Sequence, residues 1–141
     1  MTVVNTKRVW LGALVGWVVW VAWTSFVNLV VMMPLYTVAG QANQILKVPR
    51  YSFFVPVRFV ILFVLALVCA WLYAGSRATR GAGPKTALSI GVAVGFASGF
   101  PLAFTLAAWA TFSRYIALGC MLDLWVGAIL ATLVAGWLYR D

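Results

Sequence analysis

The sequence predicts an all-α integral membrane protein, an antiparallel four-helix transmembrane bundle made of two helical hairpins with both termini on the same side. Composition is the first reason. Hydrophobic residues make up 65% of the 141 residues and charged residues 9%, and the mean hydropathy is +1.05, far outside the range of water-soluble domains. The second reason is that the apolar residues gather into four stretches, each matching the roughly 20 helical residues needed to cross about 30 Å of hydrocarbon.

The four stretches place the expected spans at residues 9–33, 54–73, 87–109 and 116–139 of a single transmembrane domain covering 1–141. Helices are expected because a backbone in lipid must satisfy its own hydrogen bonds. An alternative treats the first stretch as a signal peptide, since basic residues precede it. Its apolar run is about twice as long as a normal signal core, which favours an uncleaved span.

The connections between the spans differ in length. Residues 76–86 and 111–115 form short turns, as in antiparallel helical hairpins. Residues 34–53 form a longer connector with polar and apolar residues mixed, a pattern compatible with a short interfacial helix. A connector lying on the membrane surface is the favoured interpretation, and a lid or partner-docking loop is the alternative.

The net charge of +8 does not predict nucleic-acid binding, because the basic residues are dispersed along the membrane boundaries and form no continuous tract. Lipid headgroups are the expected partner. The terminus side carries Lys7, Arg8, Arg77, Arg80, Lys85 and Arg140, and the opposite side carries Lys47, Arg50, Arg58 and Arg114. This bias places the termini in the cytoplasm, and we expect a bacterial inner (plasma) membrane.

Small residues at helical spacing predict close packing between helices. Such residues let helix backbones approach in lipid, where the hydrophobic drive for association is missing. The set comprises Gly12, Gly16, Gly91, Gly95, Gly99, Gly127, Ala131 and Ala135. Most of these positions fall in the terminus-side half of the bilayer, so we expect that half to be tightly packed and without a pore. Contacts within one chain are favoured, and a seam between copies of the chain is the alternative.

Polar residues collect in the opposite half, around Asp123. This carboxylate lies roughly 10 Å inside the start of its helix, where leaving it unpaired would cost several kcal/mol. Arg58 is the first expected partner and Arg114 the second, because its long stem can reach inward. Asn28, Thr24 and Thr105 are expected at the same depth.

Two interpretations of the Asp123 cluster remain open. The favoured interpretation is a structural ion pair that fixes helix register. The alternative is a proton-linked, ion-linked or headgroup-binding site. A single pair without His, Glu or a second acid makes a poor proton relay.

Trp17, Trp20 and Trp23 lie too deep for an interfacial aromatic belt. They are expected to face lipid, a neighbouring subunit, or a flat pigment or quinone, in that order. Haem or chlorophyll held by histidine is excluded because the chain has 0 His. Cys69 and Cys120 are expected at opposite depths, too far apart for a disulfide. No catalytic, cofactor-binding or metal-ligating residues are predicted.

Function is predicted only coarsely. The favoured hypothesis is a non-catalytic accessory or scaffold subunit of a larger membrane complex, packing through its small-residue and Trp faces against other membrane subunits or copies of itself. The alternative is a small homo-oligomeric transporter or channel with a polar site around Asp123 and Arg58. A membrane enzyme ranks third.

Overall fold

The computed structural model describes residues 4–139, which form helices and their connections without a strand in that range. Four helices are long and apolar enough to cross a membrane, so the described chain is an all-helical membrane protein, as predicted. They are Thr6–Val31, comprising α1 (Thr6–Phe26) and its π-helical continuation η1 (Val27–Val31), then α3 (Phe54–Arg80), α4 (Pro84–Trp109) and α5 (Arg114–Leu138). A short helix, α2 (Met33–Gln41), follows η1.

Each of the four long helices extends beyond its expected span at an end that carries basic residues. The first helix begins at Thr6, capped by the Asn5 side chain, which accepts a hydrogen bond from the Arg8 amide. Helix α3 continues to Arg80 and ends at Gly81, whose φ of +85° is a conformation that glycine adopts without strain. Charged residues can stay helical where the helix leaves the membrane, which hydropathy alone does not reveal.

The connector between α1 and α3 contains the helix that the sequence suggested. Helix α2 covers Met33–Gln41, with Pro34 in its first turn, where its missing amide hydrogen is not needed. Just before it, Met32 is buried against Gly119 at the start of α5. The connector is therefore held against the bundle at this end.

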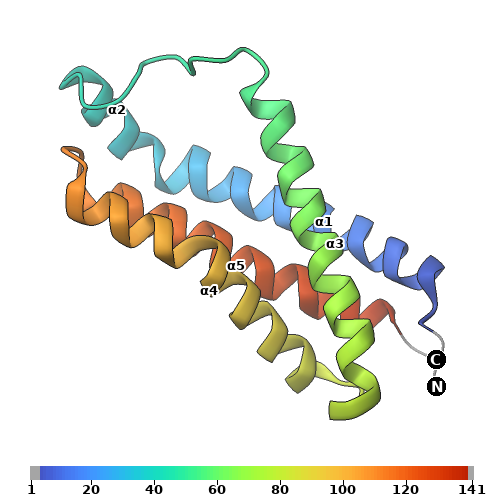
Figure 1. The fold of residues 1–141 in the computed structure, drawn as a ribbon. Helices are drawn as coiled ribbons and strands as arrows, with labels where there is room; N and C mark the ends of the chain where they lie inside the picture. Colours follow the sequence, from blue (N-terminus) through green and yellow to red (C-terminus); the bar gives the residue numbers. More distant parts are fainter. Residues whose placement is uncertain (1–3, 140–141) are drawn as a thin grey trace.

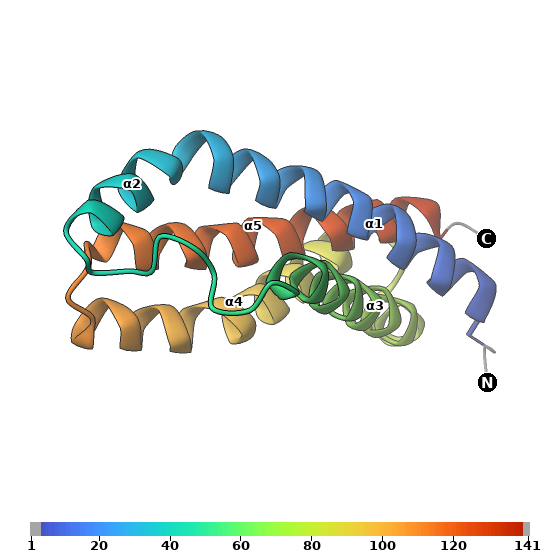
Figure 2. The same cartoon turned by 90° about the horizontal axis from the view of Figure 1, so that it is seen from above.

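Helix α5 occupies the centre of the bundle and contacts α1, α3 and α4. Figure 2 shows it between α1 and α4. Figure 1 shows α3 crossing α1 at a steep angle and running from that crossing toward the connector.

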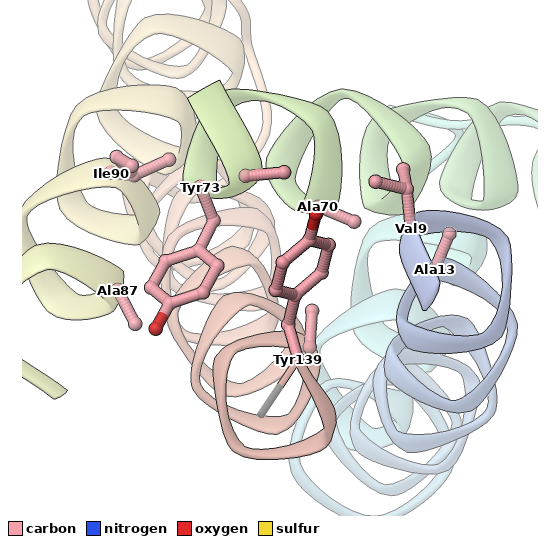
Figure 3. Packing of buried hydrophobic residues seen from close by; sticks show 9 residues of the cluster. Val9, Ala13, Ala70, Tyr73, Ala87, Ile90 and Tyr139 are labelled. Atoms are coloured by element: carbon pink, nitrogen blue, oxygen red, sulfur yellow. The ribbon is translucent and has the colours of Figure 1, made fainter. Parts of the chain in front are cut away.

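The core at the terminus end draws on all four long helices (Figure 3). Its labelled members are Val9, Ala13, Ala70, Tyr73, Ala87, Ile90 and Tyr139. The rings of Tyr73 and Tyr139 meet edge to face with centroids 6.4 Å apart. The Tyr139 hydroxyl accepts from the Asn5 amide at 2.8 Å, and the Tyr73 hydroxyl accepts from the Gly83 amide at 3.2 Å. The first bond joins the start of α1 to the end of α5, and the second joins α3 to the α3–α4 turn.

Candidate functional site: a buried ion pair beside a cavity

Helices α1 and α5 meet along one row of residues, spaced four apart on each helix. On α1 the row runs from small residues to Trp and Thr, and on α5 it runs in the opposite direction. The pairs are Gly12 with Ala135, Gly16 with Ala131, Trp20 with Gly127 and Thr24 with Asp123. This row, the α1–α5 contact row, places Asp123 at its far end from the termini.

Helix α4 packs on α5 through its three glycines. A methyl group added at Gly91 would lie 2.7 Å from Ile129 Cα, and one added at Gly95 would lie 2.8 Å from Trp125 Cα. At Gly99 the nearest atom would be the Met121 carbonyl oxygen at 3.2 Å. The small residues predicted from the sequence therefore lie at contacts within this chain.

Asp123 is almost completely buried, with 2% of its surface exposed. Its Oδ2 atom accepts three hydrogen bonds from two other helices and η1. Thr24 Oγ1 donates at 2.7 Å, Asn28 Nδ2 at 3.1 Å and Arg58 Nη2 at 2.6 Å. Oδ1 accepts none from the described residues. Because Arg58 is cationic, the bond from Nη2 is also an ion pair.

The π-helical turn η1 and the connector support this arrangement. Asn28 lies in η1, and its Nδ2 also donates to the Thr24 carbonyl at 2.8 Å. From α2, the Tyr36 hydroxyl donates to Asn28 Oδ1 at 3.0 Å. Burial is the main cause that raises the pKa of the Tyr36 phenol above its usual range, so the hydroxyl stays protonated and remains a donor. The connector is thus hydrogen-bonded to the residues that hold Asp123.

Arg58 differs from Asp123 in being 33% exposed. Its Nη2 atom makes the bonds to Asp123 and to Thr24 Oγ1, the latter at 3.1 Å. The side chain also lines a cavity of about 740 Å³ between α1, η1, the connector and α3. The cavity is lined by Thr24, Ser25, Asn28, Leu29, Tyr36, Ile45, Leu46, Pro49, Arg50, Tyr51, Phe54, Val55, Arg58, Phe59 and Cys120.

The structure brings together four of the six residues that the sequence placed in the polar site, namely Asp123, Arg58, Thr24 and Asn28. The other two lie elsewhere. Thr105 is exposed on α4, and its hydroxyl donates to the Pro101 carbonyl of the same helix at 2.9 Å. Arg114 is exposed at the start of α5, with its guanidinium 5.5 Å from the centre of the Tyr115 ring.

Residues at the same depth in the membrane need not be in contact. Depth does not determine which side of its helix a residue lies on. Figure 2 shows α4 and α1 on different sides of α5, and Thr105 belongs to α4. Tyr36 and Cys120 also line the cavity, and neither was predicted as a site residue from the sequence. A tyrosine near the end of a span is typical of the membrane–water interface. Only the packing of α2 against the bundle brings Tyr36 to Asn28.

The three deep tryptophans all make contacts within the chain. The full burial of Trp20 removes it from the outward face expected from the sequence, whereas Trp17 and Trp23 keep part of their surface exposed. Trp17 Nε1 donates to the Phe59 carbonyl at 2.9 Å, and Trp23 Nε1 donates to the Asp123 carbonyl at 3.2 Å. Trp20 is 0% exposed and packs on Gly127. A spacing of three residues spreads these side chains over about 120° of the helix surface. That sector faces α3 and α5.

Comparison with protein-family models, curated proteins and solved structures finds no match to this chain. Its class therefore follows from the fold and the site alone. The described chain is an all-helical membrane protein in which a buried Arg–Asp pair lies beside a cavity at one end of the bundle.

Proposed function

We propose that this protein is a small, non-catalytic membrane transporter that binds its substrate in the cavity beside Arg58 and Asp123. The observation that carries the proposal is that Arg58, while paired with Asp123, forms part of the cavity wall. An ion pair whose sole role is to fix helix register has no need for a cationic partner that faces open space. Mostly apolar cavities with a few converging polar groups are the usual form of small-molecule sites.

The packing below the site supports a carrier over a channel. Trp20 fills the space over Gly127 one helical turn from Asp123, and small residues close the contact row further toward the termini. A continuous pore through a single chain would have to displace this packing. Substrate passage therefore requires a change in helix arrangement.

The charge distribution supports an orientation with both termini in the cytoplasm of a bacterial inner membrane. The terminus side carries six basic residues in the sequence, against four on the cavity side. One of those four, Arg58, is paired with Asp123 inside the bundle. Only three unpaired basic residues then remain among the described residues on the cavity side, which strengthens the positive-inside bias toward the terminus side. In this orientation the cavity lies toward the outside of the cell.

An accessory subunit of a larger membrane complex is the second candidate, and one observation favours it. Phe96, Phe100 and Phe104 stack along an exposed face of α4, with ring centroids 4.7 and 5.9 Å apart. This aromatic row is a more suitable partner surface than the small residues and tryptophans, which are used inside the chain. Co-purification of unrelated membrane subunits that is lost with Phe100→Ala would favour this candidate.

The transporter proposal is tested with the two native cysteines. Cys120 lines the cavity, whereas Cys69 is 0% exposed in the core and serves as the matched control. In sealed vesicles, an uncharged water-soluble thiol reagent should modify Cys120 much faster than Cys69. Cys120→Ala and Cys69→Ala variants assign each rate. If Cys120 reacts no faster than Cys69 from either side, the cavity is closed to water and the proposal fails.

A further inference from the structure

We propose that the substrate of this cavity is an anionic amphiphile, a molecule with a negatively charged headgroup and an apolar tail. This inference rests on the proposed function, because it names the ligand class for the same cavity. It is carried by three features of the cavity: its charge, its apolar walls and the position of its polar groups.

The charge of the cavity is positive. Arg58 is neutralised by Asp123, but Arg50 also lines the cavity and has no ion pair among the described residues. Lys47 lines an adjoining hollow that shares Tyr36, Ile45 and Leu46 with the cavity. Of the two acidic residues in the chain, Asp123 is used in the pair and Asp141 lies outside the described residues. Positive charge set in apolar walls attracts anions and repels cations.

The walls of the cavity are mainly apolar and aromatic. They include Leu29, Ile45, Leu46, Tyr51, Phe54, Val55 and Phe59. Its volume of about 740 Å³ lies within the range of sites for molecules of drug size. A small inorganic anion would contact the arginines and leave these walls uncovered, whereas an alkyl or aromatic tail would cover them.

The polar groups are concentrated at one part of the cavity, which gives an amphiphile a direction. At the inner end Arg58 bonds to Thr24, Thr24 to Asn28, and Asn28 to the Tyr36 hydroxyl. The guanidinium bonds to the protein through Nη2, and none of the described contacts uses Nη1 or Nε. Those two nitrogens are available to a headgroup. Leu29 and Val55, which are 64% and 51% exposed, would then flank the tail.

The test measures protection of Cys120 in the full-length protein reconstituted into phosphatidylcholine bilayers. The uncharged thiol reagent is applied with dodecanoate, dodecyl phosphate, dodecyltrimethylammonium or acetate, at equal membrane loading for the three amphiphiles. Dodecanoate or dodecyl phosphate should slow the modification of Cys120, and the comparison of the two identifies a carboxylate or a phosphate headgroup. Acetate and the cationic amphiphile should not.

Two arginine variants separate the site from the general surface charge. Arg50→Gln should weaken protection by roughly twofold to fivefold, as expected when one exposed cation of the cavity wall is removed. Arg114→Gln removes an arginine at the same end of the bundle but outside the cavity, and should leave protection unchanged. Equal protection by the cationic amphiphile, or none by any amphiphile while Cys120 stays reactive, overturns the ligand class alone. Unreactive Cys120 overturns the proposed function as well.

Discussion

The two halves of the α1–α5 contact row use the same spacing for opposite purposes. Toward the termini, Gly12 and Gly16 meet alanines, and a methyl group added at Gly16 would lie 2.8 Å from the Ala131 carbonyl oxygen. At the other end the same row finishes with Thr24 against Asp123, next to a cavity. In the half toward the termini, the packed half, close backbone contact supplies packing that lipid does not drive. The half that ends with Thr24 and Asp123 is thereby free to be polar and open, and is called the polar or open half.

Two arginines illustrate the same contrast. At the terminus end, Arg77 Nη1 donates to the Tyr139 carbonyl at 3.0 Å, and its guanidinium lies 4.8 Å from the centre of the Tyr139 ring. A hollow of about 470 Å³ there is lined by Arg77 and both core tyrosines. Arg77 caps a helix end, whereas Arg58 balances a buried charge. Removing Arg77 therefore takes away a helix cap, whereas removing Arg58 leaves a buried charge unpaired.

The largest effect is expected from Arg58→Met, which breaks the polar half. The substitution leaves Asp123 buried without its counter-charge, at a cost of about 3 kcal/mol in the free energy of unfolding. Asp123→Asn should cost only about 1 kcal/mol, because the amide oxygen still accepts hydrogen bonds and Arg58, which is one-third exposed, can be hydrated. Unfolding by SDS in mixed micelles measures both changes.

The double variant Arg58→Met with Asp123→Asn, which combines the two single substitutions, sharpens this result. Removing both charges should recover a large part of the stability lost in Arg58→Met, because no unpaired charge remains buried. If the two single variants lose equal stability and the double variant loses their sum, the two residues act independently. The polar half would then not be organised around this ion pair.

The packed half is tested by a matched pair of glycine substitutions. Gly91→Ala places a methyl group 2.7 Å from Ile129 Cα, so α4 and α5 must separate. The cost of overpacking is about 1–3 kcal/mol and exceeds the gain of at most about 1 kcal/mol in helix propensity. Gly75→Ala on α3 meets nothing within 4 Å and should be neutral or slightly stabilising.

Melting temperatures in detergent compare the two glycine variants with the parent protein. Equal melting temperatures for Gly91→Ala and Gly75→Ala would mean that the α4–α5 contact is loose. In that case α4 would not be tightly packed on α5, and the contrast between the packed half and the open half would not extend to α4.

The sequence predicted the packed half better than the open half for a physical reason. Small residues every fourth position and a deep carboxylate are periodic or chemically unusual, so Gly91 and Asp123 stand out in one sequence. What a large residue faces depends on its neighbour, so the fit of Trp20 on Gly127 was not predicted. Nor was the return of Tyr36 to Asn28, which depends on the path of the connector.

The smallest effect is expected from Tyr36→Phe, which separates the connector from the polar half. At neutral pH the variant loses the hydrogen bond to Asn28, worth about 0.5–1.5 kcal/mol. The pKa of Tyr36 is raised by burial, whereas an unfolded tyrosine loses its proton near pH about 10. Above that pH the unfolded state binds fewer protons than the folded state, so the stability of the parent protein falls as pH rises.

Tyr36→Phe lacks this titration, and its stability deficit should therefore shrink between neutral pH and the alkaline range above pH about 10. Unfolding midpoints of both proteins across that range provide the measurement, and titrations common to both cancel in the difference. A deficit that stays constant at every pH would show that Tyr36 is as solvated in the folded protein as in the unfolded one. The connector would then lie over the cavity without being hydrogen-bonded to it, and the open half would lack its link to α2.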